Sequence, residues 1–154
     1  MEKQKEKMSK KKIIILIIVI LGIMLAGLIV LSNYMMPKTV PIEESTTFTK
    51  DELEVKCLAV VFALNMEDYE TLQQDYADET MKEFLTKEKM DSAKEKMDVD
   101  WKANVSFGDA SIVEMEQSGK LYAVAQLPVT YGDKVVTYTL TFDKEYKLAG
   151  LYMK

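Results

Sequence analysis

The stretch Lys120–Phe142, with the sequence KLYAVAQLPVTYGDKVVTYTLTF, decides the fold of this chain. Apolar or aromatic residues occupy every second position of its first half, which is the period of a β-strand with one buried face. Gly132-Asp133 is typical of a two-residue hairpin turn. A turn there pairs Tyr131 with Lys134 and puts apolar residues opposite one another along one face. Because a shift by one residue would mix the two faces, the pattern predicts this register.

The next hairpin along the chain continues the same face. A two-residue turn at Lys144-Glu145 would pair Leu140 with Ala149 and keep the following apolar residues on the buried side. We therefore predict a further antiparallel strand after this turn.

The preceding hairpin offers two registers. A two-residue turn at Ser118-Gly119 would put two glutamates on the apolar face. A three-residue loop, Gln117–Gly119, would put Val113 and Met115 there instead, and its glycine would supply the left-handed residue that such loops need. We predict the three-residue loop, and with it an antiparallel meander of about four strands.

Helices precede the sheet. Thr49–Glu52 has the pattern of a capping box, and Phe48 with Leu53 has the spacing of a hydrophobic staple, so two signals place a helix start at the same residues. Helical spacing of apolar residues continues to about Met97, with Asp78 at a position suited to cap a later helix. Helices on one face of an antiparallel sheet make an α+β fold, which we expect for residues 48–154.

The N-terminal region has a different character. Residues 1–12 carry six lysines and two glutamates, and residues 13–31, from Ile13 to Leu31, are 19 residues without a charge. Such a run is long enough for a bilayer, and no small-residue cleavage site follows it. We expect a cytoplasmic tail (1–12), a retained transmembrane helix (13–31) and a linker (32–47). The positive-inside rule then places the domain (48–154) outside the bacterial plasma membrane.

Composition excludes several kinds of chemistry. The chain has no histidine, no arginine and one cysteine, Cys57. The chain therefore cannot form a Ser-His catalytic pair, an imidazole metal site or an intrachain disulfide. The net charge of −5 is the sum of +4 in residues 1–12 and −9 in the rest, which argues against nucleic acid as a partner. We expect no metal, no cofactor and no catalytic residue.

Three segments resemble a known family. They are Phe62–Tyr69 (FALNMEDY), Thr80–Lys82 (TMK) and Thr141–Tyr152 (TFDKEYKLAGLY). Over about residues 50–154 the chain resembles the bacterial domain of unknown function 3887, within the cone-shaped nuclear-transport-factor-2-like superfamily. The resemblance implies helices packed on a curved sheet and carries over no catalytic residues. Enzymes of this superfamily can place a carboxylate and a tyrosine in the pocket between sheet and helices.

Three aromatic residues are the candidates for lining a pocket. Tyr131 and Tyr138 fall on the face of the sheet that the helices cover. Trp101 stands where the helical pattern gives way to strands, and either closes the base of the cone as core or lines a ligand pocket. A tyrosine in the core with its hydroxyl at a pocket mouth is the simpler interpretation of the other two.

These observations favour a membrane-anchored extracytoplasmic domain with a non-enzymatic binding or assembly role at the cell envelope. Its partner would be a protein or a small apolar ligand, and the oligomeric state is open. One alternative is a scaffold subunit of a conjugation or type IV secretion-like machine. Another is a small enzyme that uses a pocket carboxylate and a tyrosine.

Overall fold

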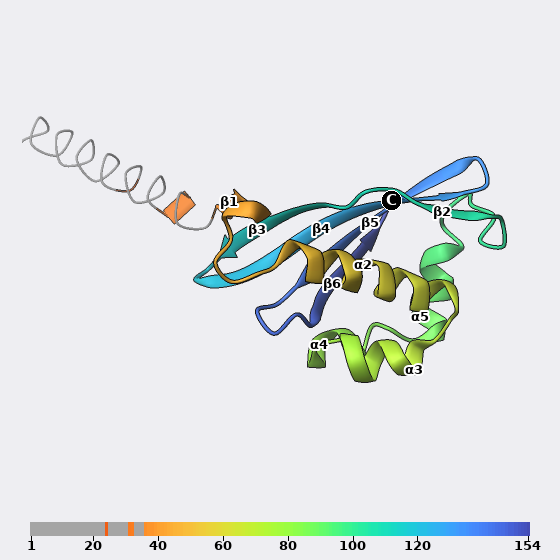
Figure 1. Ribbon diagram of the computed structural model, residues 1–154. Helices are drawn as coiled ribbons and strands as arrows, with labels where there is room; N and C mark the ends of the chain where they lie inside the picture. Colours follow the sequence, from red (N-terminus) through yellow and green to blue (C-terminus); the bar gives the residue numbers. More distant parts are fainter. Residues whose placement is uncertain (1–23, 25–30, 33–35) are drawn as a thin grey trace, which may run out of the picture. The chain divides into compact units, whose positions relative to one another are not determined.

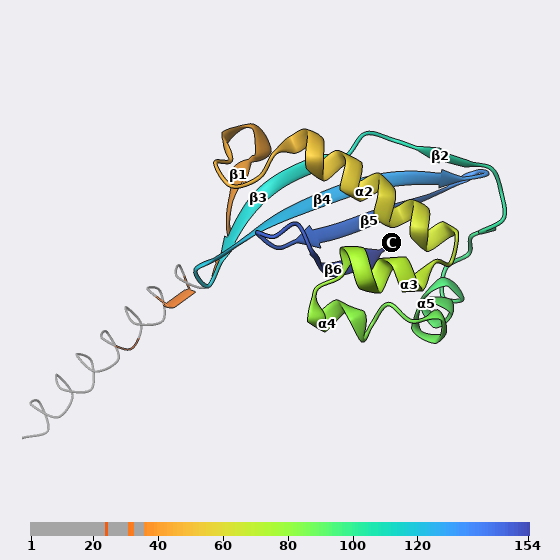
Figure 2. The ribbon, with the colours of Figure 1, turned by 60° about the horizontal axis from the view of Figure 1, so that its bottom comes forward.

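The computed structural model describes Met24, residues 31–32 and residues 36–154. The chain divides into two units, Met1–Pro37 and Lys38–Lys154, and the second is the α+β domain. In this domain, helices lie on one face of a single antiparallel sheet (Figures 1 and 2). The helical elements are η1 (Ile42–Glu44, 3₁₀), α2 (Lys50–Asn65), α3 (Tyr69–Thr71), η2 (Leu72–Tyr76, π), α4 (Glu79–Lys82) and α5 (Lys87–Lys94).

The sheet has six strands, where the sequence predicts about four. Five are ordered β1-β3-β4-β5-β6, and β2 pairs with the second half of β4. The prediction missed β1 and β2 because both are short and exposed along their whole length, so they lack the alternation that marks a half-buried strand. The strands are β1 (Lys38–Pro41), β2 (Val105–Phe107), β3 (Ser111–Gln117), β4 (Lys120–Tyr131), β5 (Lys134–Phe142) and β6 (Leu148–Met153).

The predicted transmembrane helix is not supported. Within the described part of the chain, no helix combines the length and the apolar character that a membrane crossing requires. The segment 13–31 itself lies outside the described residues, apart from Met24 and Leu31. The folded unit also begins before the expected boundary at residue 48, since Lys38–Pro41 pairs with β3 and Ile42 is buried.

The central hairpin has the predicted register. Tyr131 pairs with Lys134, and the pairing continues to Ala123 opposite Phe142. Apart from Lys134 at the turn, which is exposed, the residues of this hairpin that face the helices are apolar and almost fully buried. The segregation of apolar and polar faces therefore fixed this pair of strands, as expected.

Both neighbouring hairpins differ from the prediction. Between β3 and β4 the chain uses the two-residue turn at Ser118-Gly119, with both residues at positive φ, and this puts Glu114 on the helix-facing side. The three-residue loop was wrong because η1 and the following loop, not apolar helix, cover this end of the sheet. There Ser45 Oγ donates a hydrogen bond of 2.6 Å to the Glu114 carboxylate.

The last hairpin is offset by two residues from the prediction. Leu140 pairs with Leu151 and not with Ala149. The connection is longer than two residues because the Asp143 carboxylate accepts hydrogen bonds from the backbone amides of Glu145 and Lys147. An offset of two keeps the same residues on the buried face, so the apolar face still continues into β6.

The main helix begins at the predicted residue, but the hydrogen bond at its start is not the predicted capping-box bond. Thr49 is the N-cap of α2, but its side chain makes no capping bond. Its backbone amide donates to the Tyr146 hydroxyl at 2.8 Å, and the ring of Tyr146 meets Phe48 edge to face. Asp78 caps α4 as predicted, accepting from the Met81 amide at 2.7 Å.

Candidate functional site

Helix α2 carries apolar residues on two sides. One side, which includes Leu53, Val60 and Leu64, is buried against the sheet. The opposite side has four large apolar side chains exposed to solvent, at spacings of three, four and four residues. We call these residues the α2 stripe: Val55 (67% exposed), Leu58 (43%), Phe62 (60%) and Met66 (65%).

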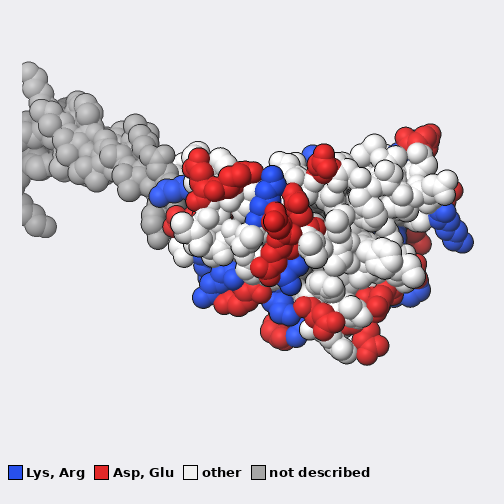
Figure 3. Space-filling view, viewed as in Figure 1, with Lys and Arg blue, Asp and Glu red and all other residues white. Residues whose placement is uncertain are grey.

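This stripe departs from the usual pattern of a surface helix, which is polar on its outer side. The sequence from Cys57 to Met66, CLAVVFALNM, contains no charged residue. Figure 3 shows an uncharged area over the second half of α2, bordered by acidic and basic side chains. Contiguous exposed apolar surface of this kind marks interaction sites in soluble domains.

A hollow of about 670 Å³ adjoins the last turn of α2, and we call it the α2-end hollow. Met66 belongs to both the stripe and the hollow, so the two form one continuous surface. Trp101 is the largest apolar side chain that lines it. The other lining residues are Asn65, Glu67, Asp91, Lys94, Glu95, Met97, Val99 and Lys102.

A buried series of hydrogen bonds lies beneath the hollow. The Tyr131 hydroxyl donates to Asn65 Oδ1 at 2.6 Å and lies 2.7 Å from the Tyr138 hydroxyl, which therefore donates to it. The ring of Trp101 meets that of Tyr131 edge to face at 5.0 Å between centroids. These hydrogen bonds link β4 and β5 to the end of α2, and so they fix the position of the residues around the hollow.

The electrostatics of these groups disfavour proton transfer at neutral pH. Burial raises the pKa of both Tyr131 and Tyr138, so their hydroxyls stay protonated. The Lys87 ammonium, hydrogen-bonded to Glu67 at 2.8 Å, lowers the pKa of that carboxyl. Glu67 therefore stays ionised and paired, and is poorly suited to act as a general acid.

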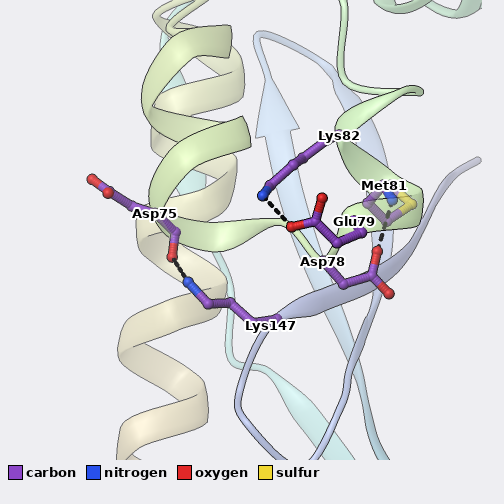
Figure 4. A network of polar contacts seen from close by, with 6 residues as sticks. All are labelled: Asp75, Asp78, Glu79, Met81, Lys82 and Lys147. Atoms are coloured by element: carbon purple, nitrogen blue, oxygen red, sulfur yellow. Dashed lines mark hydrogen bonds and ion pairs between the residues drawn. The ribbon is translucent and has the colours of Figure 1, made fainter.

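A second hollow, of about 870 Å³, lies between α4 and the turns at one end of the sheet, but its carboxylates already have structural partners. Asp78 caps α4 and Asp143 closes the turn before β6. Figure 4 shows the neighbouring polar contacts, in which Lys147 Nζ donates to the carbonyl of Asp75 at 2.6 Å and Lys82 pairs with Glu79. The Lys147 bond ties the segment before β6 to η2, whereas the Lys82–Glu79 pair lies within α4.

The structure brings the three predicted pocket residues together, in different roles. Trp101 is partly buried, lines the α2-end hollow and contacts Tyr131. Tyr131 and Tyr138 are about 1% exposed and lie below its floor. Whether a ligand occupies the hollow stays a prediction.

The sequence analysis missed the α2 stripe. Its signal was present, because the uncharged run 57–66 has more apolar residues than one buried helix face can use. Leu58 and Phe62 fall on the side opposite the buried positions when the run is read at 3.6 residues per turn.

Comparison with known proteins identifies the family. The sequence profile of a protein of unknown function (DUF3887) matches residues 58–151. The chain belongs to the DUF3887 family. The match includes the second half of α2, the α2-end hollow and most of the sheet, and of the stripe it leaves out Val55 alone.

One solved structure supports the fold of this DUF3887 protein. It is the NMR structure of a protein from Ruminococcus gnavus ATCC 29149, with a TM-score of 0.61 and 20% identity. The alignment covers 75% of this chain and 99% of the other. No curated protein sequence is significantly similar. The relation to nuclear-transport-factor-2-like proteins and the cellular location stay predictions.

Proposed function

We propose that this DUF3887 protein is a non-enzymatic binding module that takes an apolar helical segment of a partner protein along the α2 stripe. The observation that carries the proposal is the exposed row of Val55, Leu58, Phe62 and Met66 on a helix whose other side is core. Its members lie about 17 Å apart from first to last, at about 1.5 Å per residue. This length fits three turns of an amphipathic helix.

The α2-end hollow gives such a helix an anchor point. Hot spots of protein interfaces are apolar or aromatic side chains that enter well-packed pockets. Met66, Met97 and Trp101 would contact an inserted leucine or phenylalanine of the partner, and methionine side chains adapt to different shapes.

Charge at the ends of the stripe favours a partner with lysine or arginine beside its apolar face. Asp51 and Glu54 lie at the start of α2, and Asp68 follows its end beside Glu67, which already pairs with Lys87. Of the lysines near the start, Lys50 pairs with Glu43 at 3.1 Å, and the Lys56 ammonium lies over the ring of Tyr76. Opposite charges at both ends would speed association and fix the register.

The same charges disfavour a second copy of the chain at the stripe. Two antiparallel α2 helices would set the acidic start of each beside the acidic end of the other.

The tyrosine and glutamate groups near the hollow favour binding over catalysis as well, because their protonation states are fixed at neutral pH.

Site-specific photocrosslinking in the protein's own host tests the proposal. A benzophenone amino acid at Phe62 should give one adduct of constant mass. The adduct should disappear when Leu58→Ser and Met66→Ser are added. The same probe at Phe84, which is 51% exposed and lies outside the stripe, is the matched control. Equal adducts at both positions, or none at Phe62, would contradict the proposal.

A further inference from the structure

Six of the chain's 11 methionines lie in the unit Lys38–Lys154, and one of these six differs from the others in its exposure. The side chain of Met66 is 65% exposed. The other five are buried or partly buried, namely Met81, Met90, Met97, Met115 and Met153. Met66 therefore carries the thioether of this unit that is most accessible to a reagent in solvent.

Met66 also occupies the point where the two parts of the proposed binding surface meet. It is the last member of the α2 stripe, and it lines the α2-end hollow. Its backbone amide donates to the carbonyl of Phe62 at 3.0 Å, which holds the residue at the end of α2. A chemical change of this one side chain therefore alters the stripe and the hollow together.

Cysteine does not compete with Met66 for an oxidant while the domain is folded. Cys57 is the one cysteine of the chain, and it is fully buried. Burial raises the pKa of its thiol to about 12, so very little reactive thiolate forms at neutral pH. A two-electron oxidant in solvent therefore reacts first with an exposed thioether.

The hollow beside Met66 is lined by hydrogen-bond donors that an oxidised methionine can use. The Tyr131 hydroxyl occupies Asn65 Oδ1 at 2.6 Å, whereas the amide nitrogen of Asn65 has no partner within the ranges that the structure describes. Lys94 and Lys102 add two ammonium groups to the lining. A sulfoxide oxygen is a strong acceptor of hydrogen bonds, whereas a thioether sulfur is a weak one.

We infer that Met66 is a reversible oxidation site at which a hydroperoxide weakens partner binding along the α2 stripe. The sulfur attacks the terminal oxygen of the hydroperoxide, so an S–O bond forms and the O–O bond breaks. The other oxygen takes up the proton and leaves as water or as an alcohol. The sulfur loses two electrons, the hydroperoxide gains them, and a methionine sulfoxide reductase restores the thioether.

The inference rests on the proposed function, because it concerns the same stripe and hollow. The sulfoxide is polar, and it replaces an apolar side chain where the partner helix would insert its anchor residue. Hydrogen bonds from Asn65 and the two lysines would hold the oxidised side chain in the hollow. The oxidised protein therefore loses both the end of the stripe and the anchor point.

Peptide mass spectrometry of the full-length chain after brief exposure to dilute hydrogen peroxide tests the site. Met66 should be oxidised at least about threefold faster than any other methionine of the unit Lys38–Lys154. Met90, which is 5% exposed, is the internal control and should stay reduced. Circular dichroism should show that the fold is retained. Equal rates at Met66 and Met90 in the folded chain would overturn the inference.

A dye that binds exposed apolar surface tests the effect of oxidation without a partner. Its fluorescence on the wild type should fall after peroxide treatment and recover with methionine sulfoxide reductase. Met66→Leu keeps an apolar side chain that peroxide does not oxidise, so its fluorescence should stay constant. Met36, which is 62% exposed, is present in both proteins and cannot cause the difference. An equal fall in Met66→Leu would overturn the inference.

The crosslinking experiment separates this inference from the proposed function. Peroxide treatment before irradiation should lower the yield of the Phe62 adduct at least about fivefold, and Met66→Leu should prevent this loss. An adduct that survives complete oxidation of Met66 would overturn the inference and leave the proposed function standing. Absence of the adduct before oxidation would contradict the proposed function, and the dye measurement then decides the oxidation site on its own.

Discussion

Three buried or half-buried tyrosine hydroxyls differ in their hydrogen bonds, and this difference has measurable consequences. Tyr131 bonds to two groups and Tyr138 to one. The hydroxyl of Tyr69 is enclosed and has no partner among the residues that the structure describes. A buried polar group without a partner loses its hydration and gains nothing in return.

Replacing each tyrosine with phenylalanine should change the free energy of unfolding by different amounts at the three positions. Tyr131→Phe leaves both Asn65 and Tyr138 without a partner and should lower the free energy of unfolding by about 2–3 kcal/mol. Tyr138→Phe should cost about 1 kcal/mol, and Tyr69→Phe should be neutral or stabilising. Urea denaturation measures all three. Equal losses at Tyr69 and Tyr131 would contradict the described bonding.

Cys57 should make stability depend on alkaline pH. Burial raises the pKa of its thiol from 9.0 to about 12, so the unfolded chain releases this proton first. The stabilisation is complete below pH 9 and is lost as the pH rises toward 12. The loss is at most about 1.4 kcal/mol per pH unit for one group. Urea denaturation between pH 8 and pH 10 should show this decline.

Cys57→Ala is the control for that decline. The variant lacks the thiol, so its stability should stay level up to about pH 10, where the tyrosines begin to contribute. The native wild-type thiol should also resist a thiol reagent at pH 8 until the chain unfolds. A decline from pH 9 of the same slope in Cys57→Ala would exclude the thiol as its source.

At the scale of elements, the two tight hairpins differ in how much they depend on glycine. Gly132 has φ +62, and a methyl group there would lie 3.2 Å from the side chain of Ala103. Gly119 has φ +74, but nothing lies within 4 Å of the corresponding position. Both need the left-handed backbone, and Gly132 needs the space as well.

Alanine at each turn should therefore have unequal effects. Gly119→Ala should lower stability by about 1 kcal/mol, the cost of a side chain in the left-handed region. Gly132→Ala should cost more than this, because Ala103 must also move. Thermal unfolding followed by circular dichroism compares the two variants directly. A larger loss for Gly119→Ala would contradict the packing at Gly132.

Elements with one buried and one exposed face were predictable from sequence, and the others were not. The β4–β5 register follows from the contrast between its two faces. Strand β1, with all residues exposed, gives no such contrast. The Ser118-Gly119 turn was mispredicted because the Glu114 carboxylate accepts a hydrogen bond from Ser45, which is 69 residues away along the chain. A partner so distant in sequence leaves no local signal.

The candidate site shows the same division. The sequence placed Tyr131 and Tyr138 on one face, and their hydrogen bond follows from that placement. The hollow beside Trp101 depends on how residues after α5 return to the end of α2. No periodicity encodes that path, because it is set by tertiary packing of short segments.

At the scale of the whole molecule, the α2 stripe should contribute to binding and little to stability. Phe62→Ser removes a side chain that is 60% exposed. The free energy of unfolding should change by no more than about 0.5 kcal/mol. Fluorescence of a dye that binds exposed apolar surface should fall in this variant. It should stay unchanged in Phe84→Ser, the control outside the stripe. A large loss of stability would show that Phe62 belongs to the core.

The bond between the Thr49 amide and the Tyr146 hydroxyl has a consequence for how the chain folds during synthesis. Its two residues are 97 positions apart, and Tyr146 stands at φ +58 in the last connection of the sheet. The first turn of α2 therefore acquires its cap after nearly the whole polypeptide has been made. Non-local closures of this kind slow folding. This bond can therefore form only once the final hairpin has left the ribosome.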